Sequence, residues 1–324
     1  ISFLGAGNAL MVFSAKEKKI ESPILIVTTI ASIISSLMVF VLFSNIAISI
    51  YILGYVIFNH LLYDTLGRKM YPSYAKYYMI QRFLLVGFAF GLYFLIGPIG
   101  IVFGYAFSFM PFMIKTYKKY RISKKEFSAL KEKIPFMRDS YGHSLLSILG
   151  SYADKLIIGP LFGFAFLGNY QLAFQILMIL TMISGIVFGY LLPQEASGKS
   201  HRKLWLITIL IVLASSILTI VLAPSVLPIL MPKYVPAIDL IQIMSIAAVP
   251  MTITLKYTSK FLADEKSKIV IVGAIIYISS HIIGIFTIGT EFGIQGVAVS
   301  YVIGSSLEAL YFVIINRELK KKIV

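Results

Sequence analysis

Several charged side chains lie within or beside apolar stretches of this sequence, where their types could bind ions. Lys256 and Lys260 are four residues apart, so they share one face of a helix. Facing a cavity, they would hold a phosphate or pyrophosphate as point charges. Facing lipid, they would extend their ammonium groups to the headgroups. The lipid-facing arrangement explains Lys260 better, whereas both arrangements stay open for the deeper Lys256.

Asp154 and Lys155 are a second group of charged residues, near the end of an apolar segment. Adjacent helical residues point about 100° apart, so we expect that they do not neutralise each other and that each needs its own partner. Asp154 could lock two helices together or bind a proton or cation, and Lys155 could bind a phosphate. Alternatively, both lie at the membrane interface, with Lys155 reaching the headgroups.

Three further ionisable residues are candidates. Arg82, expected at the entrance of its segment, could pair bidentately with a diphosphate or could be an ordinary basic anchor. Glu308 lies inside an apolar segment, where a carboxylate is neutral, paired with a cation such as Lys256, or part of ion coupling. His281 could titrate, but a packing histidine with a hydrogen bond explains it better.

The elements that position these residues are long stretches without Asp, Glu, Lys or Arg, at 22–63, 83–114, 156–194, 204–232 and 269–290. A helix rises about 1.5 Å per residue and needs about 20 apolar residues to cross the hydrocarbon, so the three longest stretches hold two crossings each. Turn signals divide them at Ser44-Asn45, at Gly97-Pro98, and between Gly159-Pro160 and Gly168. The sequence therefore predicts an all-α, polytopic transmembrane bundle.

About eleven crossings are expected, near residues 1–15, 23–43, 46–62, 77–96, 99–114, 139–158, 164–192, 204–230, 236–262, 269–288 and 293–315. Residues 1–114 form an N-terminal membrane lobe, 115–138 a basic linker and 139–324 a C-terminal lobe. Because two parallel repeats of six are typical of one class of transporter, we expect that a twelfth, N-terminal crossing is missing.

The net charge of +15 has an explanation in membrane orientation. Lys and Arg gather in alternate gaps between the segments, which places those gaps and the C-terminus in the cytoplasm. Basic loops also lie near anionic lipids, so a nucleic-acid partner is not implied. His60, Asp64 and Arg68 share one helical face that ends at such a gap, where a solvated polar end explains them as well as a site.

The residue types and their spacing give little indication of an enzyme. The absence of cysteine excludes disulfides, thiolate catalysis and cysteine-ligated metals, and no motif predicts a cofactor or metal. A polytopic glycosyltransferase would need paired acids in an outer loop, but Glu291 and Asp239 are far apart in sequence. We therefore do not expect an enzyme.

Four stretches resemble a known family. The stretch at 153–175 reads ADKLIIGPLFGFAFLGNYQLAFQ and resembles the seventh and eighth helices of the polysaccharide-type flippases in the multidrug/oligosaccharidyl-lipid/polysaccharide exporter superfamily. Three further stretches are similar to the family's second, tenth and last helices, in this order: FLGAGNALMVF at 3–13, MPKYVPAIDLIQIMSIAAVP at 231–250 and GIQGVAVSYVIGSSLEALY at 293–311. The resemblance implies two pseudo-symmetric six-helix lobes around a central cleft, alternating access and a lipid-linked saccharide cargo.

We therefore predict a flippase that carries a polyprenyl-linked oligosaccharide from the cytoplasmic to the outer leaflet. Four cations would hold the phosphate in the cleft: Lys256, Lys155, Arg82 and Lys260. Asp154 and Glu308 would gate the cleft or bind a coupling ion, H⁺ or Na⁺. The alternative is a cation-coupled multidrug exporter of the same superfamily, which is less favoured because the first five segments contain no acid deeper than Asp64.

Overall fold

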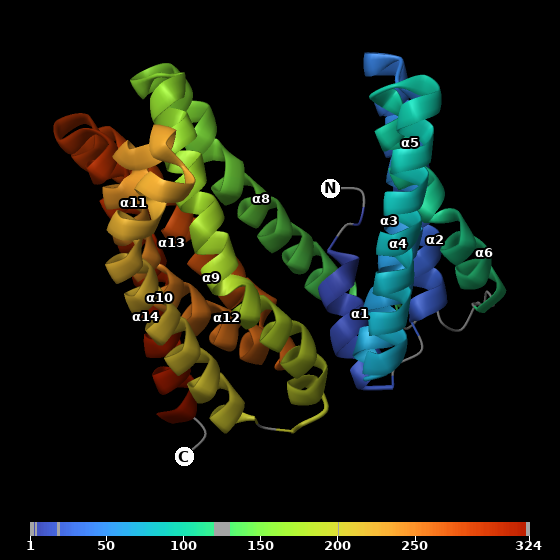
Figure 1. The fold of residues 1–324 in the computed structure, drawn as a ribbon. Helices are drawn as coiled ribbons and strands as arrows, with labels where there is room; N and C mark the ends of the chain where they lie inside the picture. Colours follow the sequence, from blue (N-terminus) through green and yellow to red (C-terminus); the bar gives the residue numbers. More distant parts are fainter. Residues whose placement is uncertain (1–2, 4, 18–19, 120–129, 200, 322–324) are drawn as a thin grey trace. The chain divides into compact units, whose positions relative to one another are not determined.

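The computed structural model describes the whole chain except residues 1–2, 4, 18–19, 120–129, 200 and 322–324. The described residues are almost entirely helical and contain no strand (Figure 1). They divide into two compact units. Unit 1 comprises Ile1–Gly142 and Leu192–Gly198, and unit 2 comprises His143–Leu191 and Lys199–Val324. The predicted all-helical class is thus confirmed.

The helices that lie wholly in unit 1 are α1 (Ala6–Ala15), α2 (Glu21–Phe43), α3 (Ile46–Gly67), α4 (Tyr71–Ile96), α5 (Ile99–Ser108) and α6 (Met110–Lys119). The turn between α2 and α3 uses Ser44 in the left-handed region, at φ 50°, and Asn45 as the N-cap, whose side chain accepts a hydrogen bond from Ile48 N. Gly97, at φ 72°, ends α4. The sequence predicted both turns correctly, because these residues tolerate or cap non-helical backbone.

Unit 2 contains most of α8 (Ile134–Phe162) and α9 (Phe164–Ala196), followed by α10 (Arg202–Leu230), η1 (Pro232–Ala237), α11 (Ile238–Ile246), α12 (Ala248–Ala263), α13 (Ser267–Gly284), the π-helical turn η2 (Ile285–Gly289) and α14 (Thr290–Lys321). Gly163, at φ 97°, separates α8 from α9 inside the predicted turn region. Gly293, at φ 60°, interrupts the helical backbone inside α14, three residues after its start. Both positions need a residue without a Cβ.

Each unit has its own apolar core. In unit 1, Phe58, Leu61 and Leu62 of α3 pack with Phe109 and Phe112 of the α5–α6 segment. In unit 2, the core joins α8, α9, α10, α11 and α14 around Ile158, Tyr170, Leu177, Met244 and Tyr301.

Small residues bring α13 and α14 of unit 2 close together. A Cβ added at Gly284 would lie 2.4 Å from Ser300 Cβ, so only glycine permits this approach. The close contact sets which face of α13 meets which face of α14, and it thereby positions the side chains of the site described below.

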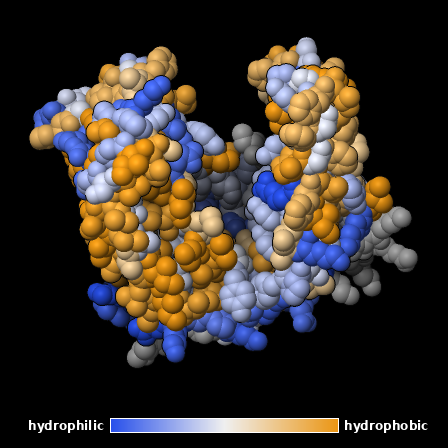
Figure 2. Space-filling view, in the orientation of Figure 1, coloured by the Kyte–Doolittle hydropathy of each residue, from blue (hydrophilic) through white to orange (hydrophobic). Residues whose placement is uncertain are grey.

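Nine helical stretches among the described residues are long and apolar enough to cross a membrane. The last of them, Ser267–Lys321, covers two predicted crossings, since it contains both α13 and α14. Helix α1 has 10 residues, fewer than the roughly 20 that a crossing needs. Large apolar side chains remain exposed on the outside of the helices, as in proteins that face lipid, and Figure 2 shows them over the middle of α9 and α10. The chain is a multi-pass membrane protein.

Two helices begin at least five residues earlier than predicted. Helix α4 begins at Tyr71 instead of residue 77, and α8 at Ile134 instead of residue 139. The prediction followed the stretches without charge, which mark the hydrocarbon layer. A helix can continue beyond that layer, because charged side chains are tolerated in a helix once they reach water.

Candidate functional site

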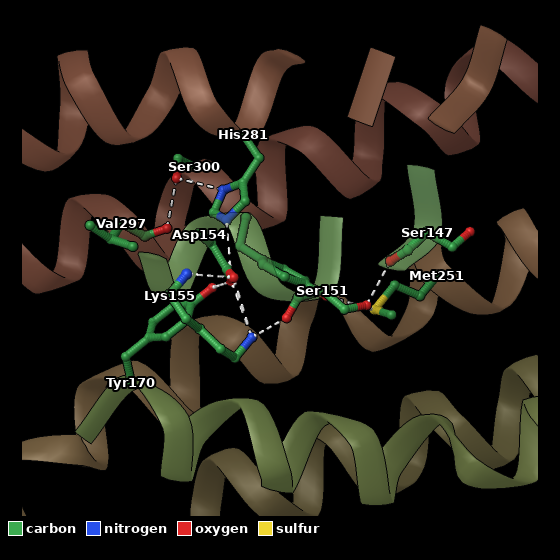
Figure 3. Close-up of polar contacts among 10 residues, drawn as sticks. Ser147, Ser151, Asp154, Lys155, Tyr170, Met251, His281, Val297 and Ser300 are labelled. Carbon is green, nitrogen blue, oxygen red and sulfur yellow. Dashed lines mark hydrogen bonds and ion pairs between the residues drawn. The ribbon is translucent and has the colours of Figure 1, made fainter. Parts of the chain in front are cut away.

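Asp154 is the centre of a buried polar cluster in unit 2 (Figure 3). Its carboxylate is fully buried, and the Tyr170 hydroxyl donates a hydrogen bond of 2.6 Å to Oδ2. Helices α8 and α9 form a hairpin about Gly163, and the two residues lie about 13 and 10 Å from that turn, so they meet at similar depth. Tyr170 is also fully buried, which fixes its hydroxyl in place.

The ammonium group of Lys155 lies in the same cluster. Its Nζ is 3.3 Å from Asp154 Oδ1 and donates a hydrogen bond of 2.5 Å to the Ser151 carbonyl. The same atom lies 3.7 Å from the ring centre of Phe174, with the rings of Tyr170 and Tyr152 within about 6 Å. The expectation that Asp154 and Lys155 do not neutralise each other was therefore wrong. It considered only the direction of Cα–Cβ, whereas the long Lys155 side chain folds back one turn along α8.

Ser300 connects His281 to the backbone of α14. The Ser300 hydroxyl oxygen lies 2.7 Å from the Val297 carbonyl and 2.9 Å from His281 Nδ1 (Figure 3). When the hydroxyl donates to the carbonyl, its oxygen accepts from Nδ1–H, and Nε2 of the neutral ring is an acceptor.

His281 Nε2 faces the Asp154 carboxylate. The atom is buried, has no hydrogen-bond partner among the described residues, and lies 3.9 Å from Asp154 Oδ2. When the ring is neutral with its proton on Nδ1, two acceptors face each other, which is unfavourable in a buried site. A proton on Nε2 makes the contact attractive. Tyr277 and Tyr301 pack against the imidazole, with ring centres 6.0 and 5.1 Å away, and shield the pair.

The structure places Arg82 on the exposed surface of α4 in unit 1. Helix α4 begins at Tyr71, so Arg82 lies about 16 Å along it and directly before the stretch without charge that begins at residue 83. Its Nη2 donates to the Tyr78 hydroxyl at 2.8 Å, and its guanidinium lies 4.8 Å from the centre of that ring. This position fits both interpretations of the sequence, a ligand for a diphosphate and a basic anchor.

The other predicted residues lie on α12 and α14 of unit 2. Lys260 donates a hydrogen bond of 2.5 Å to Asn316 Oδ1, which connects the two helices. Lys256 is half-buried, with Nζ 5.3 Å from the ring centre of Tyr257. Glu308 is also half-buried and forms no ion pair with any residue that the structure describes, so the pairing with Lys256 is not observed. The cationic cleft that would combine Arg82 with these lysines stays a prediction.

A second buried charge network lies in unit 1. Arg68 Nη2 bonds to Glu21 Oε1 at 2.5 Å and its Nε bonds to Asp64 Oδ1 at 2.8 Å, while Ser14 donates to the same Asp64 oxygen. Asp64 and His60 are fully buried, so the solvated helix end, one of the two interpretations that the sequence left open, does not hold for them. The network connects α1, α2 and α3, and the spacing on α3 alone gave no sign of those partners.

Sequence reasoning gave no site role to Tyr170, and it assigned His281 a packing role. Tyr170 stands in the Gly168-Asn169-Tyr170 motif, which entered only through the family resemblance. His281 is the only His, Asp, Glu, Lys or Arg in its apolar stretch, and this isolation is the signal that could have marked it. No three His, Asp or Glu side chains in the described part of the chain are grouped so that they could hold a metal ion.

No protein-family model matches this chain, and no curated protein sequence matches it. Solved structures do match. The Vibrio cholerae MATE transporter VcmN in its bent form is 14% identical, with a TM-score of 0.73 over 98% of this chain and 84% of that one. A multidrug resistance MATE family transporter of the MOP superfamily, in an outward-facing conformation, is 13% identical, with a TM-score of 0.76 over 98% and 83%.

A third solved structure, the MATE transporter ClbM in complex with Rb⁺, is 15% identical, with a TM-score of 0.72 over 96% of this chain and 81% of that one. At these identities the likeness concerns the fold. It covers almost the whole chain in every case. The chain therefore has the fold of the MATE transporters of the MOP superfamily.

Proposed function

We propose that this chain is a cation-coupled exporter that works by alternating access, with Asp154 and His281 as its coupling site. The fold supports an exporter of the superfamily named from the sequence. The neighbours support the multidrug alternative more than the flippase, because one of them is described as a multidrug resistance transporter and another was solved with a monovalent cation. Such a carrier needs no catalytic residues, and we propose that the chain is not an enzyme.

The observation that carries this proposal is the contact between His281 Nε2 and Asp154 Oδ2 at 3.9 Å. A proton bound between these atoms holds α8 against α13, and its loss leaves two acceptors face to face. Protonation thus favours one packing of these helices over another, which is what coupling to a conformational change requires.

The test is transport by the full chain in proteoliposomes. A fluorescent organic cation is loaded, and an imposed proton or sodium gradient drives its movement. Asp154→Asn should lower gradient-driven transport at least about tenfold, since one lost charge-assisted interaction is worth about 1.5 to 3 kcal/mol. Asp239→Asn is the matched control, because Asp239 is an exposed acid of the same unit. Undiminished gradient-driven transport by Asp154→Asn would remove the basis of the proposal.

A second candidate function, flipping of a lipid-linked oligosaccharide, is favoured by Arg82. Its exposed guanidinium on α4 is suited to pair with a phosphate or diphosphate. Arg82→Gln distinguishes the two functions. It should abolish flipping of a polyprenyl phosphosugar in a leaflet-resolved assay if the chain is a flippase, and should leave organic-cation transport intact if the chain is a multidrug exporter. Under both proposals, the C-terminus lies in the cytoplasm.

A further inference from the structure

The surroundings of the Lys155 ammonium are those of a receptor for ammonium ions. Nζ contacts the Asp154 carboxylate, the Ser151 carbonyl and the face of the Phe174 ring, with distances of 3.3, 2.5 and 3.7 Å. Two more aromatic rings, of Tyr170 and Tyr152, lie 5.8 and 5.9 Å away. A carboxylate combined with several aromatic faces is the chemistry that binds organic ammonium groups.

We propose that this cluster is a binding site for a free organic ammonium ion and that Lys155 is its tethered occupant, which must leave before the free ion enters. The proposal deepens the proposed function and rests on its coupling site. It assigns to Lys155 the role of an internal competitor, in place of the predicted phosphate ligand.

The parts of the cluster differ in how easily they can move. Asp154 and Tyr170 are fully buried and bonded to each other, whereas the Lys155 side chain is 15% exposed. Lys155 also starts on a different face of α8 from Asp154 and reaches it only by folding back towards Ser151. Other rotamers of this four-carbon chain carry the ammonium away without disturbing α8.

A free ammonium ion and Lys155 compete for the same contacts. Asp154 Oδ1 lies 3.3 Å from Lys155 Nζ, so an ammonium ion that took this place would repel the Lys155 ammonium if both were present. Replacement of one by the other leaves the charge of the site unchanged. The free ion and the Lys155 ammonium therefore cannot occupy the site at the same time.

The ligands select the class of cation. Small metal ions such as Mg²⁺ and Ca²⁺ require about six or more oxygen ligands. Here the contacts of Nζ are one carboxylate, one carbonyl and aromatic carbon faces. This mixture suits a polarisable ammonium with attached alkyl groups better than a metal ion.

Binding of radiolabelled n-propylammonium to the purified full chain tests the proposal, because this ion reproduces the three carbons and the ammonium of Lys155 that an alanine removes. Lys155→Ala should bind it at least tenfold more tightly than the unmodified protein. Lys155→Met fills the same space and should bind no better than the unmodified protein. Adding Asp154→Asn to Lys155→Ala should return binding to the weak level. Equal binding by Lys155→Ala and the unmodified protein would overturn the proposal, as would tight binding after loss of Asp154.

A second measurement uses the unmodified chain, so it holds even if a variant does not fold. Tetramethylammonium, which carries no reactive amine, should displace Lys155 and increase its acetylation by acetic anhydride at least threefold, as measured by peptide mass spectrometry. Lys233, which is exposed, is the internal reference and should not change. An unchanged Lys155 yield at saturating tetramethylammonium contradicts the proposal.

These outcomes are separable from the proposed function, because neither measurement involves a gradient or transport. Coupled transport that depends on Asp154, combined with no ammonium binding in Lys155→Ala, would refute the tethered occupant alone. Ammonium binding without gradient-driven transport would refute the exporter alone.

Discussion

The two single replacements of Asp154 and Lys155 should together cost unit 2 more stability than the double replacement of both residues. The charges are 3.3 Å apart, with side chains 0% and 15% exposed. Their attraction is about 5 kcal/mol at an effective dielectric constant of about 20. A single change, Asp154→Asn or Lys155→Met, leaves one buried charge without its partner and should cost about 3 to 5 kcal/mol of unfolding free energy. The double change leaves neither charge and should cost much less than the sum.

The assay is a double-mutant cycle on the free energy of reversible unfolding by a denaturing detergent in mixed micelles. We expect a coupling energy of about 3 kcal/mol or more for the buried pair. Arg138–Asp139 is the matched control, because these residues are also sequence neighbours and lie 3.2 Å apart, but the Arg138 side chain is 70% exposed. Its coupling should be at most about 1 kcal/mol. Equal coupling in the two cycles would refute the reasoning.

Two further predictions concern packing and topology. Gly284→Ala places a methyl group 2.4 Å from Ser300 Cβ and should cost about 1 to 3 kcal/mol of unfolding free energy. Gly185→Ala, where nothing lies within 4 Å, should be neutral or slightly stabilising; a similar loss in both would contradict the packing argument. Cysteine at Lys233 should react with an impermeant thiol reagent from outside the cell and cysteine at Lys266 should not, because the charge pattern places them on opposite sides; labelling at Lys266 would reverse the orientation.

The helices and their turns could be predicted from the sequence, because the membrane imposes a strong and local requirement. Long stretches without charge specify crossings, since a buried charge is costly anywhere along them. Ser44, Gly97 and Gly163 mark the turns, because few residues tolerate left-handed backbone. The predicted helix starts at residues 77 and 139 were wrong, and the helices begin at Tyr71 and Ile134. Hydropathy marks the hydrocarbon layer and carries no information about helix that continues into water.

The site was predicted in part. Asp154 was identified because burying an acid in a membrane costs free energy, so such a residue is a candidate for function. The role of Lys155 was misjudged, because the direction of a Cα–Cβ bond does not say where a flexible side chain ends. Tyr170 could have been paired with Asp154 from the hairpin geometry about Gly163, since both lie at similar distances from that turn.

From the sequence alone it could be predicted that this protein is helical, lies in a membrane and carries a membrane acid beside a lysine. That His281 faces this acid, with Ser300 beside its Nδ1, follows from the packing of three helices and could not be predicted from the sequence. The reason is physical. His281 and Ser300 belong to two helices whose register follows from packing at Gly284, and Asp154 belongs to a third helix more than a hundred residues earlier. Patterns within one helix record which face is apolar, but the partner of a polar residue on that face depends on how several helices pack together.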